Sequence, residues 1–238
     1  MMIGTLINVA TIVVGGVLGT ILGGRLPERL SQTVVSAMGL FTLALAIQMF
    51  LKTNNALVVL GSLVIGSLLG EWWQIENGLR KIGVWLESKV YRNQTNTTDQ
   101  KFIRGFMTAS LVFCVGPMAI LGSIENGLTG NFQTLAVKAI LDGFFSLAFA
   151  STLGIGVVFS SLMILVYQGG ITLMAGQVQA IMTPAMMNEM SAAGGVILMG
   201  VAVGSLLELR PIRVGNMLPA LALAPLIVAI LALLGINI

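Results

Sequence analysis

The sequence alternates long apolar stretches with short polar ones. Seven stretches contain no Asp, Glu, Lys or Arg, and they cover residues 1–24, 30–51, 53–70, 105–124, 143–188, 190–207 and 214–238. A helix of about 20 apolar residues crosses the hydrocarbon core of a bilayer. The stretch 143–188 is too long for one helix, and it continues an apolar segment that begins near Gln133. The pattern therefore predicts eight transmembrane helices, at about 3–23, 33–51, 56–73, 105–124, 134–152, 155–176, 193–209 and 217–236.

The composition is typical of a polytopic membrane protein and excludes several kinds of chemistry. Of the 238 residues, 56% are hydrophobic and 9% are charged, whereas about a quarter of the residues in a soluble domain are charged. The chain has no His and one Cys, Cys114, so it cannot form a zinc site, a Ser–His–Asp triad, a Cys–His dyad or an internal disulfide. We expect an all-α helical bundle without cofactor or metal ion. A net charge of +3 gives no reason to expect a nucleic acid partner.

The basic residues indicate the orientation of the eight helices. With eight crossings, ten of the twelve Lys and Arg residues fall on one side of the membrane: Arg25, Arg29, Arg80, Lys81, Lys89, Arg92, Lys101, Arg104, Arg210 and Arg213. Lys52 lies on the other side, and Lys138 lies within a predicted helix. Because loops rich in Lys and Arg stay in the cytoplasm, both termini are predicted to lie outside. The first charge follows the first apolar stretch, which favours an uncleaved first helix over a signal peptide.

Two further helices are predicted outside the membrane. After the third span, apolar residues recur at helical spacing between charged ones, at Ile75, Leu79, Ile82, Leu86 and Val90. This pattern predicts an amphipathic helix on the cytoplasmic membrane surface, followed by a polar linker. On the outer side, Thr183 and Pro184 are the residue types of a helix N-cap and a first helical position.

Three of the predicted transmembrane helices recur later in the chain in the same order. Residues 14–16, 39–46 and 58–65 resemble residues 115–117, 143–150 and 157–164, with offsets of 99 to 104 residues. Because three is odd, the second triplet starts on the opposite side of the membrane from the first. This predicts an inverted-topology repeat, helices 1–3 against helices 4–6, within one transmembrane domain, 1–238. Its parts are a first repeat (1–73), a cytoplasmic helix and linker (74–104), a second repeat (105–176), an outer segment (177–192) and two further helices (193–238).

An inverted repeat bears on function because two similar halves in opposite orientations can exchange conformations, as alternating access requires. Binding sites in such folds lie near the bilayer midplane, where corresponding helices are interrupted. Gly15 and Gly16 correspond to Gly116 and Pro117, and Pro117 must bend or break its helix. We therefore expect the first and fourth helices to meet at these four residues, with at least one helix interrupted there. Glycines also permit close helix packing, so this second interpretation stays open.

One acid lies deep within a predicted helix. Asp142 is about 13 Å into the fifth helix, near the middle of a hydrocarbon core about 30 Å thick, where a carboxylate costs several kcal/mol unless it is paired, protonated or hydrated. Lys138 lies one turn earlier on the same face. The two residues form either a structural ion pair or part of a pathway in which the pair changes partner or protonation state. Gln168, Gly169 and Gly170 combine an amide with a candidate helix break and join them as candidate pathway residues.

Three runs of sequence resemble a known family. The runs FCVGPMAILGSI (113–124), KAILDG (138–143) and YQGGITL (167–173) are similar to the YqgA-like family of prokaryotic multi-pass membrane proteins. The resemblance covers essentially the whole chain, and it implies a multi-pass protein of the bacterial or archaeal cytoplasmic (inner) membrane. That family is defined as a domain of unknown function, so the resemblance implies no catalytic or binding residues.

The residues themselves favour transport. We expect a secondary transporter or channel for a small solute or ion, embedded in the lipid bilayer, with a site near the midplane at the repeat interface. A membrane-embedded enzyme is one alternative, although Asp142, Glu125 and Glu208 are too scattered to form an evident acid–base pair. A non-transporting subunit or sensor is another. Asn8 and Gln48 are interpreted mainly as polar groups that support helix packing, and abundant small residues are compatible with a homodimer.

Overall fold

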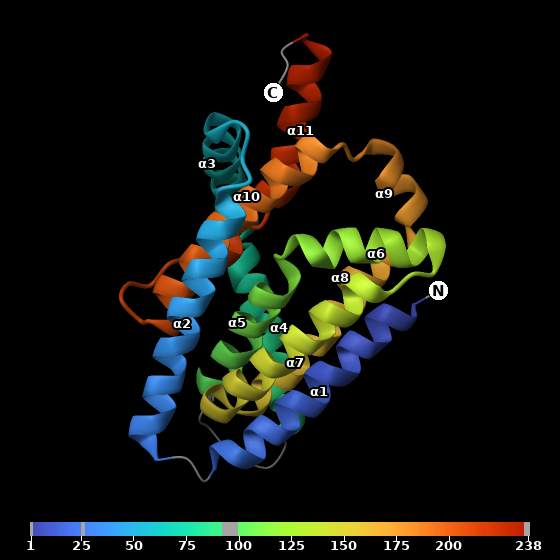
Figure 1. Cartoon of the computed structure of the whole chain (residues 1–238). Helices are drawn as coiled ribbons and strands as arrows, with labels where there is room; N and C mark the ends of the chain where they lie inside the picture. The colour runs from blue at the N-terminus through green and yellow to red at the C-terminus, as the bar shows by residue number, and fades with distance from the viewer. Residues whose placement is uncertain (1, 25–26, 92–99, 236–238) are drawn as a thin grey trace. The chain divides into compact units, whose positions relative to one another are not determined.

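The computed structural model describes residues 2–24, 27–91 and 100–235, which fold into helices joined by short connections (Figure 1). The helical elements are α1 (Ile3–Gly23), α2 (Glu28–Phe50), α3 (Ala56–Trp73), α4 (Ile75–Val90), α5 (Gln100–Cys114), α6 (Pro117–Thr129), α7 (Gln133–Leu153), η1 (Ile155–Phe159), α8 (Ser160–Leu173), α9 (Ala175–Ile181), α10 (Pro184–Val201), η2 (Ala202–Leu206), η3 (Val214–Met217) and α11 (Ala220–Leu233). No strand occurs in the described ranges. The all-α fold expected from the sequence is confirmed. Two of the basic residues that indicated orientation, Arg25 and Arg92, lie outside the described residues.

Within the described ranges, seven helical segments are long and apolar enough to cross a membrane, and the bent pair α5–α6 makes an eighth when it is counted as one span. The axes of α5 and α6 differ by 61°. The bend or break expected at Pro117 within the predicted span 105–124 is therefore confirmed. The chain leaves the helix after Cys114 and resumes it at Pro117, whose ring has no N–H to donate to the preceding turn.

The seventh span starts earlier than the apolar pattern predicts. Instead of beginning near residue 193, α10 begins at Pro184, and its N-cap Thr183 accepts a hydrogen bond from the amide of Met186 at 3.2 Å. This cap confirms the helix start predicted from the Thr–Pro pair. The helix then continues past the buried acid Glu189, which the sequence pattern treats as a boundary.

The described residues belong to two compact units. Unit 1 contains Met1–Met38, Leu79–Cys114 and Met118–Gly176, and unit 2 contains Gly39–Gly78, Val115–Pro117 and Gln177–Ile238. Unit 1 combines α1 from the first predicted triplet with α5, α7 and α8 from the second. The inverted relation between the two triplets stays a prediction.

In unit 1, α1 packs directly against α7. Three glycines of α1, spaced one turn apart, each face a backbone carbonyl of α7: Gly15 faces Gly143, Gly19 faces Leu147 and Gly23 faces Ser151. Residue numbers rise together along both helices, so α1 and α7 run parallel (Figure 1). A Cβ atom at Gly15 or Gly19 would lie 2.2 Å from the facing oxygen, so this approach of two backbones requires glycine.

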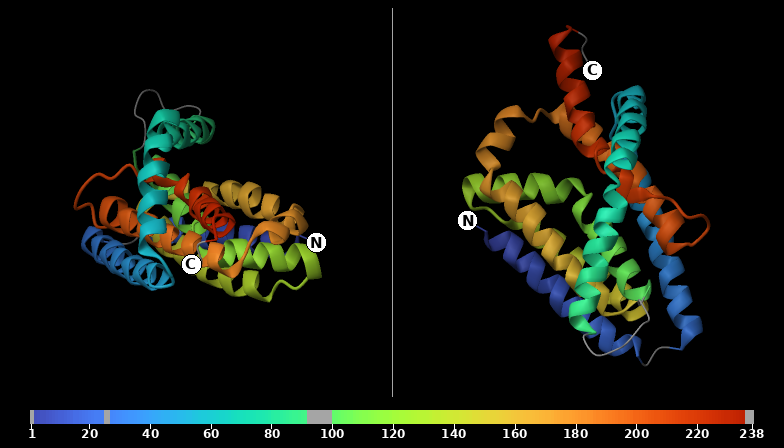
Figure 2. Two further views of the ribbon diagram at one scale, coloured as in Figure 1. Left: turned by 90° about the horizontal axis from the view of Figure 1, so that it is seen from above. Right: turned by 180° about the vertical axis from the view of Figure 1, so that it is seen from behind.

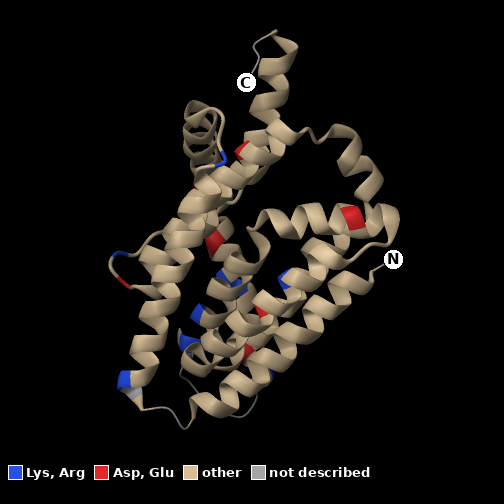
Figure 3. Ribbon diagram, in the orientation of Figure 1, with Lys and Arg blue, Asp and Glu red and all other residues tan. Residues whose placement is uncertain are grey.

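A second helix lies along α1 in the opposite direction. The hydroxyl groups of Thr5 and Thr172 are 3.4 Å apart, and Asn8 donates a hydrogen bond to Gln168. Residue numbers therefore rise along α1 as they fall along α8, and Figure 2 shows the two helices side by side when seen from behind. Figure 3 shows that α1 carries no charged residue along its length, as expected for a membrane-spanning segment.

The amphipathic helix expected after the third span is α4. Part of its apolar stripe packs on α5 within unit 1, where the buried cluster consists of Leu86, Phe102, Ile103 and Phe106. The side chains of Ile82 and Trp85 remain 42% and 58% exposed. One edge of the stripe thus packs on protein, and contact of the exposed edge with the membrane surface stays a prediction.

Unit 2 contains α3, α10 and α11 around a core of small side chains. The buried cluster consists of Val59, Ala192, Ala193 and Ala224. Gly66 of α3 lies against Ala220, and Gly70, one turn later, lies against Asn216. Residue numbers rise along α3 as they fall along the segment that leads into α11, so these two spans run antiparallel.

Candidate functional site

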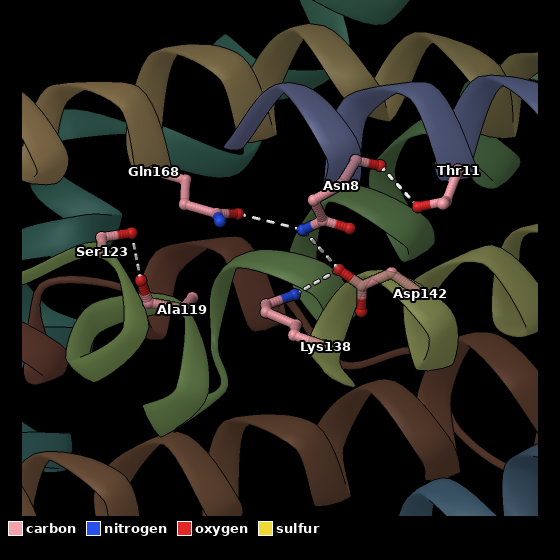
Figure 4. Close-up of polar contacts among 7 residues, drawn as sticks. All are labelled: Asn8, Thr11, Ala119, Ser123, Lys138, Asp142 and Gln168. Atoms are coloured by element: carbon pink, nitrogen blue, oxygen red, sulfur yellow. Dashed lines mark hydrogen bonds and ion pairs between the residues drawn. The ribbon is translucent and has the colours of Figure 1, made fainter. Parts of the chain in front are cut away.

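Two opposite charges lie one turn apart on α7. Lys138 and Asp142 are 5% and 7% exposed, and Lys138 Nζ donates to Asp142 Oδ2 in a buried ion pair (Figure 4). The pairing is the one expected from their spacing. Asp142 is about 13.5 Å along the helix axis from the first residue of α7, and so close to its midpoint. The ion pair therefore lies deep within a candidate membrane span.

One amide from each neighbouring helix joins the ion pair. Asn8 of α1 donates from Nδ2 to Asp142 Oδ2 and to Gln168 Oε1 of α8, with both distances at 3.0 Å (Figure 4). Asn8 and Gln168 are both fully buried. The interpretation of Asn8 mainly as a packing group is therefore too narrow, because it is the direct partner of the deepest carboxylate. We call Asn8, Lys138, Asp142 and Gln168 the polar cluster.

One hydroxyl group connects α7 with α1 beside the polar cluster, and two others bond within the helices that carry the amides. Ser146 of α7 donates to the carbonyl of Ile12 of α1 at 2.7 Å. Thr11 donates to the carbonyl of Asn8 at 2.9 Å, and Thr172 donates to the carbonyl of Gln168 at 2.9 Å. These bonds fix the backbone that carries the two amides.

Two polar atoms of the cluster have no hydrogen-bond partner within the described part of the chain. They are Asn8 Oδ1, an acceptor, and Gln168 Nε2, a donor of two hydrogen bonds. Most buried polar atoms in folded proteins are paired, and an unpaired one costs about 1–3 kcal/mol. The polar cluster thus holds a neutral ion pair with one free acceptor and one free donor beside it.

The interrupted fourth span ends next to the ion pair. Lys138 Nζ lies 6.0 Å from the ring centroid of Phe113, the penultimate residue of α5. The last residue, Cys114, is half-buried and interacts electrostatically with both Lys138 and Asp142. Where the helix stops, the carbonyl groups of the last turn and the amides of the next first turn lose their intrahelical partners. Backbone groups without an intrahelical partner therefore lie close to the charges.

The helix that follows the interruption contacts the start of α7. Gly122 of α6 packs against Leu135 of α7, with a Cβ position 2.6 Å from that side chain.

The glycines predicted to interrupt the first span do not interrupt it. α1 is continuous from Ile3 to Gly23, and Gly15 and Gly16 face α7 and η1 at close range. The absence of a side chain serves helix packing here, and no proline removes a backbone hydrogen bond. The interruption occurs at Gly116 and Pro117, as expected for at least one of the two spans. These two residues belong to unit 2, so their expected meeting with Gly15 and Gly16 stays a prediction.

The candidate helix break at Gly169 and Gly170 is wrong. α8 runs without interruption from Ser160 to Leu173. A Cβ at Gly169 would approach only the side-chain end of Met2, and one at Gly170 would meet open space. Of this trio, only Gln168 enters the polar cluster.

Sequence analysis missed one fully buried acid in unit 2. Glu189 of α10 accepts hydrogen bonds from Thr53 Oγ1 at 2.7 Å and from the amides of Asn54 and Asn55 at 2.7 and 3.1 Å. It holds the connection between α2 and α3. An acid between two apolar stretches resembles a loop residue, and the apolar pattern alone contains no signal for this role. Among the described residues, no group of three or more His, Cys, Asp or Glu side chains could hold a metal ion.

Comparison with known proteins places the chain in a family. A family model described as "Protein of unknown function (DUF554)" matches residues 3–229. The chain is 32% identical to "Uncharacterized protein YqgA" of Escherichia coli (strain K12), over 94% of this chain and 95% of that protein. It is 28% identical to "Uncharacterized membrane protein YdfK" of Bacillus subtilis (strain 168), over 99% and 100% of the two chains. No solved structure matches it significantly. The chain is therefore a membrane protein that belongs to the DUF554 family.

Proposed function

We propose that the chain is a membrane transport protein, a secondary transporter or channel for a small solute or ion, and that the polar cluster lines its pathway. The observation that supports this proposal most directly is the incomplete hydrogen bonding of the polar cluster. A buried ion pair near the middle of a span lies beside a free acceptor and a free donor. A purely structural network would be expected to pair all its members, because each unpaired buried amide atom costs about 1–3 kcal/mol. An incoming ligand would complete the network.

The interruption of the fourth span supports the same proposal. Irregular backbone at membrane depth is tolerated where it is buried in protein or lines a cavity, because lipid cannot pair the freed backbone groups. In transporter folds, helix ends of this kind point at substrates and ions. The break at Gly116 and Pro117 lies three to four residues beyond Phe113, whose ring lies near Lys138.

Chain direction supports eight crossings, with α5–α6 counted as one broken span. α1 and α7 run parallel, so an odd number of crossings must separate them. α2 and α3 supply two, and α5–α6 must supply the third. α3 and α11 run antiparallel, which requires an even number of crossings between them, namely α5–α6, α7, α8 and α10. If α5–α6 were a re-entrant loop, the directions of both pairs would be reversed.

Eight crossings and the distribution of Lys and Arg together support both termini outside and the basic loops in the cytoplasm. In a prokaryotic relative of the two proteins matched above, this corresponds to the inner membrane. With eight crossings, the second predicted triplet of helices begins on the opposite side of the membrane from the first. An inverted repeat that supports alternating access requires this arrangement. Superposing helices 1–3 on helices 4–6 in an experimental structure would test the repeat.

The test is ion flux through the purified full-length chain in liposomes. A trapped pH dye and an imposed potassium diffusion potential report proton movement, and the external salt is varied to find the second ion. We expect flux in the wild type and at least a tenfold loss in Asp142→Asn, because the amide keeps the shape and removes the charge. Glu125→Gln is the matched control, since that carboxylate binds Asn131 and Thr134 in the connection between α6 and α7.

Two outcomes would overturn the proposal. Wild-type flux in Asp142→Asn would leave the ion pair as a structural contact. No flux in the wild type under any pH, potential or salt gradient would favour a non-transporting role.

A further inference from the structure

The charges of the polar cluster restrict what it can bind. Lys138 and Asp142 are both buried and their charges sum to zero, so an added ion would leave an uncompensated buried charge. Two exchanges keep the sum at zero. An anion can enter together with a proton that neutralises Asp142, or a cation can enter as Lys138 releases a proton.

The free groups of the cluster favour the first exchange. Gln168 Nε2 is fully buried and unpaired, and it belongs to the same amide whose oxygen accepts from Asn8 in Figure 4. The ammonium group of Lys138 also has two protons that Asp142 does not use. These groups donate hydrogen bonds, as an anion requires.

The one free acceptor has a different use. Asn8 already donates from Nδ2 to the carboxylate of Asp142, and its Oδ1 is unpaired on the same amide. If Asp142 takes up a proton, it becomes a donor, and a rotation of the Asn8 amide places Oδ1 where it accepts that proton. Asn8 can therefore pair with either protonation state of Asp142.

We propose that the polar cluster binds one small monovalent anion between Lys138 and Gln168 Nε2, and that one proton binds to Asp142 with it. The proton adds to a carboxylate oxygen of Asp142, and Lys138 exchanges its ion-pair partner from Asp142 to the anion. The net charge of the site stays zero throughout. This inference rests on the proposed function, because it names the ligand class of the same site.

Few other titratable groups lie near Asp142. α5 contributes Cys114 and α7 contributes Lys138 itself, while α1 and η1 contain no titratable side chain. Tyr167 of α8 interacts with Cys114 and so lies one group further away. Cys114→Ser and Tyr167→Phe are therefore controls for the origin of the proton.

The experiment measures proton uptake by the purified full-length protein in detergent at low buffer concentration. Sodium nitrate and sodium formate are the probes, and sodium gluconate at the same sodium concentration is the control for cation and ionic strength. We expect the medium to become alkaline on addition of nitrate or formate, with about one proton taken up per anion bound. A response to nitrate alone or to formate alone identifies an inorganic or a carboxylate ligand within the same class.

Variants separate the roles of the residues. Gln168→Glu keeps the acceptor for Asn8 and replaces the free donor by an acceptor, so anion affinity should fall by at least about tenfold. Asp142→Asn should bind the anion without proton uptake. Thr42→Val removes another buried, unpaired polar atom, in unit 2, and should leave both quantities unchanged.

Three results would overturn the inference. They are no proton uptake with either anion in the wild type, proton release with sodium gluconate, and loss of uptake in Cys114→Ser or Tyr167→Phe with Asp142 intact. Failure of the proposed function is distinguishable from these. If flux depends on Asp142 but does not change with the anion present, only this inference is overturned. If anion binding is linked to proton uptake but no flux is measured, only the transport proposal is overturned.

Discussion

Replacing Gly15 with alanine should separate α1 from α7 and disturb the polar cluster at once. The added Cβ would lie 2.2 Å from the carbonyl oxygen of Gly143, and contacts shorter than 3.0 Å are essentially never seen for real Cβ atoms. The two backbones must therefore move apart by about 0.8 Å, the difference between those distances. Neither side can adapt by a rotamer change, because the clash is with backbone.

The expected loss of stability follows from two contributions. Overpacking of a close helix contact costs about 1–3 kcal/mol. Asn8 lies two turns from Gly15 on the same face of α1, so a rigid displacement along its hydrogen bond would stretch the 3.0 Å distance to Asp142 Oδ2 to about 3.8 Å. A hydrogen bond to a charged group contributes about 1.5–3 kcal/mol. We expect Gly15→Ala to lower the free energy of unfolding by about 3 kcal/mol.

Equilibrium unfolding in mixed micelles with increasing SDS measures this change. Gly170→Ala is the matched control, since its Cβ would meet open space within α8 and alanine is the better helix former by about 0.5–1 kcal/mol. Unfolding of Gly15→Ala at the wild-type SDS concentration would refute the parallel, glycine-mediated contact between α1 and α7.

Two further predictions concern acids of unit 2. Glu189→Gln should destabilise the protein by about 2–3 kcal/mol in the same unfolding assay, because the amide cannot accept all the bonds that Thr53 and the following backbone amides donate. Burial raises the pKa of Glu76 above its ordinary value of 4.5, although the amide of Gly215 and the charge of Arg213 oppose this. Its contribution to stability is thus present in full below pH 4.5 and falls as the pH rises through the raised pKa. Glu76→Gln should remove that part of the pH dependence of unfolding, and an unchanged profile would contradict it.

The membrane spans could be predicted because the hydrocarbon core of the bilayer requires each span, independently of the others, to be long and largely free of charged residues. An uncharged stretch long enough to cross the bilayer is visible in the sequence without knowledge of its neighbours. The interruption of the fourth span was equally local, since Pro117 cannot donate a backbone hydrogen bond. The ion pair of Lys138 and Asp142 followed from spacing on one helix.

What could not be predicted depends on contacts between helices. Asn8 is a lone amide in an apolar stretch, and only the packing of α1 against α7 and α8 brings it to Asp142. Glycines such as Gly15 and Gly16 occur both where a helix is interrupted and where two helices pack closely, so the sequence alone does not distinguish the two roles. The carbonyl of Gly143, which faces Gly15 in the structure, shows that the role here is close packing. Glu189 likewise acquires its role from a connection more than a hundred residues away in the chain.

The central claim is that Asp142 and Lys138 act as a pathway and not only as a contact between helices. The most direct measurement exchanges the two charges, in Lys138→Asp combined with Asp142→Lys, and compares unfolding and liposome flux with the wild type. The exchanged pair keeps its spacing of one turn, and the free Oδ1 of Asn8 can accept from the new ammonium group. The account predicts a folded protein with little loss of stability and at least a tenfold loss of flux, because a carboxylate no longer occupies position 142. Wild-type flux through the exchanged pair would contradict it.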